Sequence, residues 1–92
     1  MVLVDYYSFD YANTADTESS QEVNGALDSA AQTFHAQIAD GFATFKAAAA
    51  AYHGDSCAAG LLTRLTSGGC GIHPSAIGQA LLAAAVERVV DK

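Results

Sequence analysis

The chain has 92 residues, of which 51% are hydrophobic and 15% charged, and its formal net charge at pH 7 is −6. A chain of this length accommodates one small domain and buries only about 60–65% of its unfolded surface. Four Lys and Arg residues against ten Asp and Glu argue against nucleic-acid binding, because phosphate contacts need basic side chains.

No apolar run approaches the ~20 residues of a transmembrane helix, and the first residues lack the basic and apolar regions of a signal peptide. Residues 2–4 are Val-Leu-Val, followed by the aromatic residues Tyr6, Tyr7 and Phe9. Short β-branched and aromatic runs favour strands, so we predict a β-strand that is buried at its start. From residue 10 to residue 21 the sequence is polar, which predicts a surface loop.

A helix is predicted to begin at Ser19 or Ser20, where Ser19 and Glu22 have the spacing of a capping box. Apolar residues then recur three or four positions apart on one helix face: Val23, Leu27, Ala30, Ala31, Phe34 and Ile38. The same spacing continues through Phe42 and Phe45, which predicts a helix as far as Tyr52. Gly54 has the residue type that follows a helix C-terminus.

The next segment is predicted to contain one or two helical turns over residues 57–65, with Ser56 as their N-cap. Residues 67–69, Ser-Gly-Gly, are predicted to be flexible. A terminal helix is predicted to begin after Pro74, with Ser75 as its cap, and to run to about residue 90. Its apolar residues cover a wide face, so it should be buried against another element.

His73 lies directly before Pro74. The proline fixes its own φ and moves the preceding residue out of the helical region. We therefore expect His73 in a loop just before the terminal helix, held on a rigid backbone. An imidazole placed in this way is suited to act as a general base near neutral pH.

The block Gly71-Ile72-His73-Pro74-Ser75, followed by Gly78 and an apolar helix, resembles the C-terminal block of the SGNH/GDSL serine hydrolases, which are esterases and lipases. In that family the histidine is the general base and usually lies in an Asp-x-x-His-Pro sequence. Here the residue three before His73 is Cys70. The family's opening strand with its nucleophile block, and its oxyanion-hole blocks, are not recognisable in this chain.

The resemblance implies an α/β fold of the flavodoxin-like type, of which residues 1–92 would form a single domain corresponding to the C-terminal part of a longer hydrolase. It places a parallel strand at residues 2–4 and implies a short strand around residues 37–40 followed by a short helix. Residues 36–41 therefore stay open between helix and strand. By content, the chain is expected to be mainly helical.

The resemblance also implies a function, which is hydrolysis of carboxylic esters through a serine, with His73 as base. The substrate would be a small ester or a lipid, with no cofactor and no metal, and the parent protein would be secreted or extracytoplasmic. Gly54-Asp55-Ser56 spells the family's nucleophile residues, so Ser56 is the candidate nucleophile. Asp55 is the candidate to orient His73, as the nearest preceding carboxylate in sequence, and a Cys57–Cys70 pairing would have to bring the two together. The alternative for Ser56 is a purely structural helix cap. Other candidate nucleophiles are Ser8, Ser67 and Ser75.

Cys57 and Cys70 flank the segment that precedes His73. We expect them to form a disulfide, partly because members of the resembled family look similar here, and it would contribute ~3 kcal/mol in the chain-entropy model. Two free thiols are the alternative, and zinc binding lacks a fourth ligand.

The second functional hypothesis is a non-catalytic hydrolase fragment whose exposed helix faces make it an α-rich oligomer. A homo-oligomer is expected in either case, since association would cover the apolar surface of a partial domain. A small helical binding module unrelated to hydrolases is a third possibility.

Overall fold

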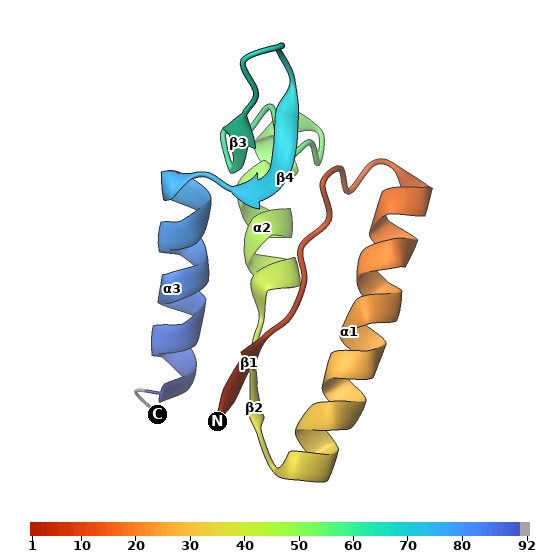
Figure 1. Cartoon of the computed structure of the whole chain (residues 1–92), viewed down its shortest axis with the longest axis vertical. Coiled ribbons are helices and arrows are strands. Elements are labelled where there is room, and N and C mark those ends of the chain that lie inside the picture. The colour runs from red at the N-terminus through yellow and green to blue at the C-terminus, as the bar shows by residue number, and fades with distance from the viewer. Residues whose placement is uncertain (91–92) are drawn as a thin grey trace.

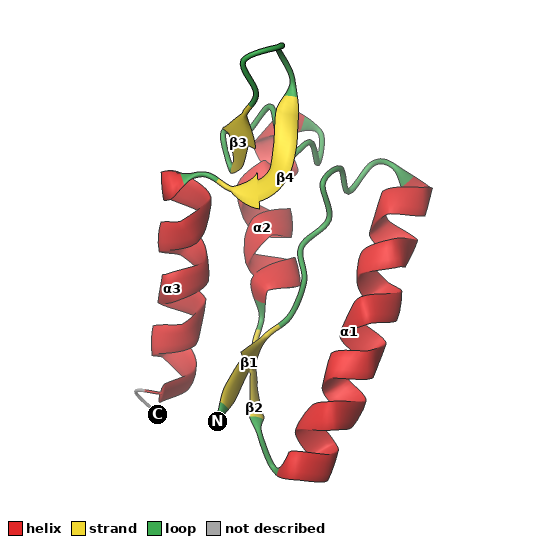
Figure 2. Cartoon of the chain, in the orientation of Figure 1, coloured by secondary structure: helices red, strands yellow, loops and turns green. Residues whose placement is uncertain are grey.

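A computed structural model describes residues 1–90, and over these residues the chain is a small α/β protein, about half helical, with two small sheets (Figures 1 and 2). The helices are α1 (Thr14–Phe34), α2 (Gly41–Ala49) and α3 (Ala76–Val90), and the 3₁₀ turn η1 (Ala50–Tyr52) extends α2. The strands are β1 (Val2–Val4), β2 (Gln37–Ala39), β3 (Leu62–Arg64) and β4 (Cys70–Pro74). The predicted α/β class, N-terminal strand and C-terminal helix are confirmed.

The first sheet consists of β1 and β2, which run parallel with Leu3 opposite Ile38. Helix α1 connects the two strands, as a parallel pair requires. The sheet lies between α1 and α3 (Figure 1). Both faces of this parallel pair are therefore covered by helices, as is usual for parallel strands.

The second sheet is the antiparallel hairpin of β3 and β4, with Leu62 opposite Pro74 and Arg64 opposite Cys70. A disulfide joins Cys57 to Cys70, which confirms the predicted pairing and excludes free thiols and a zinc site at these cysteines. The hairpin lies beyond the carboxyl ends of β1 and β2, on the side where both parallel strands lead into the rest of the molecule (Figure 1).

The core is centred on Phe45 of α2, which is fully buried and lies in one cluster with the buried residues Leu61 and Leu62. The Tyr7 ring stacks on Phe45 with ring centroids 4.3 Å apart, and Tyr6 stacks on Tyr7 at 4.9 Å. Exposure rises along this stack from 0% at Phe45 through 6% at Tyr7 to 38% at Tyr6. The stack thus connects the core to the surface beside α1.

Helix α1 begins earlier than predicted. Its N-cap is Asn13, whose side-chain oxygen accepts a hydrogen bond from the Asp16 N–H at 3.1 Å. The predicted start at Ser19 or Ser20 is therefore wrong, and the predicted polar loop ends at residue 13. Ser20 lies buried inside the helix, where its hydroxyl donates to the Tyr7 carbonyl at 2.8 Å.

Residues 37–39 form a strand, so the continuous helix to Tyr52 is wrong and the strand implied by the resemblance is confirmed. The preceding helix ends at His35, which adopts a left-handed φ of 55°. The next helix begins after Asp40, whose carboxylate accepts from the Ala43 N–H at 2.8 Å. A cap on each side interrupts the apolar periodicity that had favoured one helix.

The segment after α2 also differs from the prediction. Residues 57–60 form turns rather than a helix, and β3 follows at residues 62–64. His73 lies in strand β4 rather than in a loop, because Leu62 and Arg64 provide an antiparallel partner for residues 70–74. The predicted cap of the terminal helix is confirmed, since the Ser75 hydroxyl oxygen accepts from the Gly78 N–H at 3.1 Å.

Candidate functional site

His73 is presented by the second strand of the β3–β4 hairpin, close to its junction with α3. The Thr63 hydroxyl on the facing strand donates to the His73 carbonyl at 3.0 Å. The histidine is exposed, and no hydrogen bond within residues 1–90 involves its imidazole. The hairpin therefore holds the backbone of His73 while its ring remains accessible to solvent.

Strand β4 is attached to the core beside His73 by Tyr7. The Tyr7 hydroxyl donates to the Ile72 carbonyl at 2.7 Å. Burial, and secondarily the neighbouring Tyr6 phenol, raises the pKa of Tyr7 to about 12, so this phenol remains a neutral donor at physiological pH. From sequence, Tyr7 belonged only to a strand-favouring aromatic run, and this hydrogen bond was missed because its acceptor is 65 positions away.

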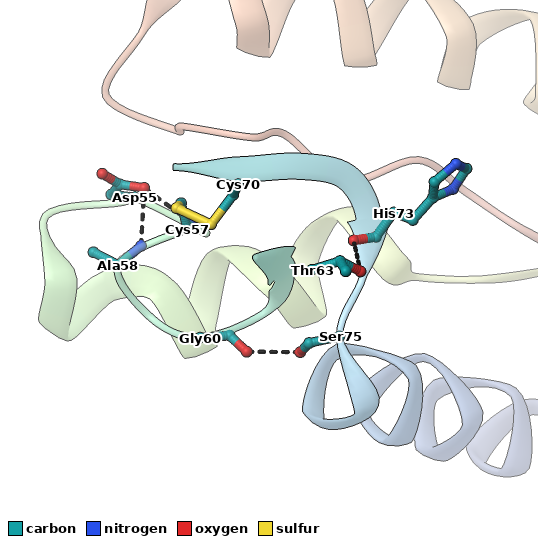
Figure 3. The surroundings of a disulfide bond; sticks show 8 residues. All are labelled: Asp55, Cys57, Ala58, Gly60, Thr63, Cys70, His73 and Ser75. Atoms are coloured by element: carbon teal, nitrogen blue, oxygen red, sulfur yellow. Dashed lines mark hydrogen bonds between the residues drawn. A yellow bond between two sulfur atoms is a disulfide. The ribbon is translucent and has the colours of Figure 1, made fainter. Parts of the chain in front are cut away.

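The disulfide and Ser75 fix the two ends of β4. Cys70 is joined to Cys57 with a Cα–Cα distance of 5.8 Å. The Ser75 hydroxyl donates to the Gly60 carbonyl at 2.7 Å, and its N–H donates to the Leu61 carbonyl at 2.8 Å (Figure 3). These contacts hold the strand that carries His73 at both ends.

Ser56, the candidate nucleophile, is fully buried. Its hydroxyl donates to the Ser8 carbonyl at 2.7 Å, and its N–H donates to the Phe9 carbonyl at 3.0 Å. The Leu61 N–H in turn donates to the Ser56 carbonyl at 3.0 Å. Ser56 thus connects the segment after β1 to the turn before β3, and its hydroxyl is not at the surface.

Asp55, the candidate orienting carboxylate, caps the turn that follows it. One carboxylate oxygen accepts from the Cys57 N–H at 2.9 Å and from the Ala58 N–H at 3.2 Å. Figure 3 shows Asp55 and His73 at opposite ends of the hairpin, with the imidazole directed away from Asp55 and the disulfide. Among residues 1–90, no hydrogen bond joins His73 to Asp55 or Ser56, so the catalytic roles of these three side chains stay predictions.

Two of the other candidate serines also have structural partners. The Ser8 side chain is fully buried, with its hydroxyl 3.1 Å from that of Thr17. Ser75 is the cap of α3 described above. Ser67 is exposed at the tip of the hairpin, between β3 and β4.

In the part of the chain that the structure describes, no three His, Cys, Asp or Glu residues are grouped as a metal site. No helix among these residues is long and apolar enough to cross a bilayer.

A cavity of about 210 Å³ opens between α1 and the segment after β1. It is lined by Tyr6, Phe9, Asp16, Ser19, Ser20 and Val23. The signal for this cavity in the sequence is the aromatic run Tyr6, Tyr7 and Phe9. The contribution of α1 was missed because residues 14–18, the first part of this helix, were predicted to be a loop.

Comparisons of this chain with protein-family models, with curated proteins and with solved structures find no match.

Proposed function

We propose that this chain is the base-bearing, C-terminal part of an SGNH-type carboxylic-ester hydrolase that acts by serine acyl transfer on a small ester or a lipid ester. His73 is the general base. One observation carries the proposal: the exposed imidazole lies on a braced strand beyond the carboxyl ends of β1 and β2. Open α/β sheets bind their ligands at this edge.

In this mechanism, His73 accepts the proton of a serine hydroxyl as its oxygen attacks the ester carbonyl carbon. The resulting imidazolium then protonates the departing alcohol, which leaves an acyl-serine. A water molecule activated by the neutral imidazole releases the carboxylic acid. The braced backbone supports this role, because a base must be held within hydrogen-bond reach of the proton it accepts.

Which serine acts as the nucleophile is a separate question, because the best candidate from the sequence, Ser56, is buried. The buried Ser56 hydroxyl donates to the Ser8 carbonyl, so attack from this position requires that hydrogen bond to break and the side chain to become exposed. A fluorophosphonate probe, which forms a covalent adduct with activated serines, identifies the nucleophile by peptide mass spectrometry. Adduct at Ser56 would confirm the sequence-based assignment, and adduct at a different serine would replace it.

The base is tested by hydrolysis of p-nitrophenyl acetate. The chain offers matched controls, because His35 and His53 are also exposed but lie in left-handed caps outside β4. Each histidine is replaced by Asn, which tolerates the left-handed region. The proposal expects His73→Asn to reduce the rate to that of buffer, whereas His35→Asn and His53→Asn retain it.

Equal rates in the three variants would show that the hydrolysis is ordinary imidazole catalysis and would contradict the role of His73. A hydrolysis rate of the unmodified chain no higher than that of buffer would contradict the hydrolase proposal for this chain.

The second candidate function is that of a non-catalytic fragment that forms oligomers. It is favoured by the exposed apolar residues Val4, Tyr6 and Val23 near one edge of the sheet.

A further inference from the structure

The outer edge of β1 carries main-chain groups without partners. The Gln37 N–H donates to the Met1 carbonyl and the Asp5 N–H to the Ala39 carbonyl, both at 3.0 Å. Odd-numbered residues of β1 therefore face β2, and Val2 and Val4 direct their N–H and C=O groups to the opposite side. Within residues 1–90, no hydrogen bond reaches these four groups from that side.

This free edge has a defined end. Two residues after β1, the Tyr6 main chain faces the same side, and the Asn24 side chain of α1 forms hydrogen bonds with both its N–H and its C=O. Asn24 thus occupies the position that a neighbouring strand would take at Tyr6. Within residues 1–90, the unpaired groups of this edge are those of Val2 and Val4, which are placed symmetrically about Leu3.

The two faces of the β1–β2 sheet are already covered by helices. Helices α1 and α3 lie on its two faces (Figure 1), so the sheet can be extended only along its edges. All-parallel sheets occur almost only where both faces are covered, and an isolated pair of strands is at best marginally stable. Val4 nevertheless remains 38% exposed at this edge.

We propose that the occupant is β1 of a second copy of this chain, paired antiparallel about a two-fold axis at Leu3. Val2 of each copy then lies opposite Val4 of the other. Each of these residues offers one donor and one acceptor, so the pairing satisfies all four free groups of each copy. The product is a four-stranded sheet in the order β2-β1-β1-β2, with a closed isologous interface.

The cavity beside Tyr6 supports this register. Met1 of the second copy falls opposite Asp5, next to Tyr6 and the cavity that Tyr6 lines with Val23. Met1 is 83% exposed and Val23 is 47% exposed. The pairing therefore brings exposed apolar side chains of the two copies together. It does not involve His73, so the assembly and the hydrolase activity can be tested separately.

Cross-linking tests the register. Opposed residues at a non-hydrogen-bonded antiparallel position have Cα atoms about 4.5 Å apart, within reach of a disulfide. Leu3→Cys places a thiol on the axis, and the native cysteines are already paired. Ile38→Cys is the matched control, because it lies beside Leu3 in the same sheet but away from the free edge. Under mild oxidation we expect a covalent dimer of the Leu3→Cys protein and none of the Ile38→Cys protein.

Sedimentation equilibrium, which measures the strength of dimerisation, tests whether the free edge of β1 forms the interface. Val4→Pro removes an outward N–H without removing a hydrogen bond within the chain. We expect roughly tenfold weaker dimerisation than in Val4→Thr, which keeps the N–H, with circular dichroism showing that both variants are folded. Equal dimerisation of these two variants, or no preference for cross-linking at position 3, would overturn the interface. A parent chain that is monomeric at all concentrations would also overturn it and would leave the edge to a strand from another polypeptide.

Discussion

The side-chain amide of Asn24 forms hydrogen bonds with both main-chain groups of Tyr6, and its nitrogen lies 2.9 Å from the Tyr6 carbonyl oxygen. A residue in the middle of a long helix thereby acts as the last hydrogen-bonding partner of the segment that follows β1. Asn24 is 9% exposed, so its side-chain amide is largely shielded from water and has these two Tyr6 groups as its partners.

We expect Asn24→Ala to lower the free energy of unfolding by about 1–3 kcal/mol, because the partly buried N–H and C=O of Tyr6 lose their partners. Urea denaturation checks the loss. Gln32→Ala is the control, since Gln32 lies on the same helix and is exposed. Equal effects of the two substitutions would mean that the Asn24–Tyr6 hydrogen bonds contribute little to stability.

Replacing either of two helical glycines, Gly78 and Gly25, with Ala should change the stability of the protein in opposite directions. At Gly78 a Cβ would collide with the Leu61 carbonyl oxygen and approach Phe45 Cζ to 3.0 Å, whereas at Gly25 it would meet nothing within 4 Å. We expect Gly78→Ala to destabilise the protein by about 1–3 kcal/mol, as overpacking does. Gly25→Ala should stabilise it by about 0.5–1 kcal/mol through helix propensity. Thermal unfolding of both variants checks the opposite signs.

Ser56 should affect stability whatever its role in catalysis. Ser56→Ala leaves the buried Ser8 carbonyl without its donor and should cost about 1–3 kcal/mol. Ser67→Ala, at the exposed hairpin tip, should be neutral within about 0.5 kcal/mol. Chemical denaturation distinguishes the two. An unchanged midpoint for Ser56→Ala would show that the Ser56–Ser8 bond is not a significant stabilising contact.

The buried tyrosines predict a loss of stability at alkaline pH. Desolvation is the main cause that raises the pKa of both Tyr7 and Tyr11 from 10.0 to about 12 in the folded chain. Between these values the unfolded chain loses phenolic protons that the folded chain retains. Stability should therefore be complete below pH 10 and should fall as the pH rises toward 12.

Tyr7→Phe and Tyr11→Phe should each flatten this pH dependence, while Tyr52→Phe, a change at an exposed tyrosine, serves as the control. Denaturation midpoints measured across the alkaline range provide the comparison. The same slope in all four proteins would contradict the assignment of the alkaline transition to Tyr7 and Tyr11.

Removal of the disulfide by replacing Cys57 and Cys70 with Ser should cost about 3 kcal/mol in the chain-entropy model. Amide hydrogen exchange should increase most in β4, which the bond and Tyr7 hold in place. If exchange in β4 remained as slow as in α2, the hairpin would not depend on the disulfide.

The parts of the fold that sequence reasoning identified depend on local signals. Residues 2–4 have strand-forming side chains, and Ser75 caps a long apolar helix, so β1 and α3 were predicted correctly. The start of α1 was missed because the helix buries Ser20 and Asn24, both polar, and an apolar stripe does not indicate them. Polar residues with buried main-chain partners resemble a solvated loop in sequence.

The remaining errors arise from long-range partners. The strand at residues 37–39 is defined by pairing with Val2–Val4, and β4 by pairing with β3. At the candidate site, the sequence identified His73, the disulfide and the Ser75 cap, but not the Tyr7 hydroxyl that holds β4. The hydrogen bond from Ser56 to Ser8 crosses 48 positions, so no local pattern could reveal that the Ser56 hydroxyl is buried.

The disulfide also gives the molecule a closed covalent loop from residue 57 to residue 70. This loop contains Arg64 and the exposed hairpin tip, which is the kind of segment that proteases cut. A single cut after Arg64 would break the main chain without releasing either piece. The strand that carries His73 would therefore remain attached to the segment before the cut until a reductant separated them.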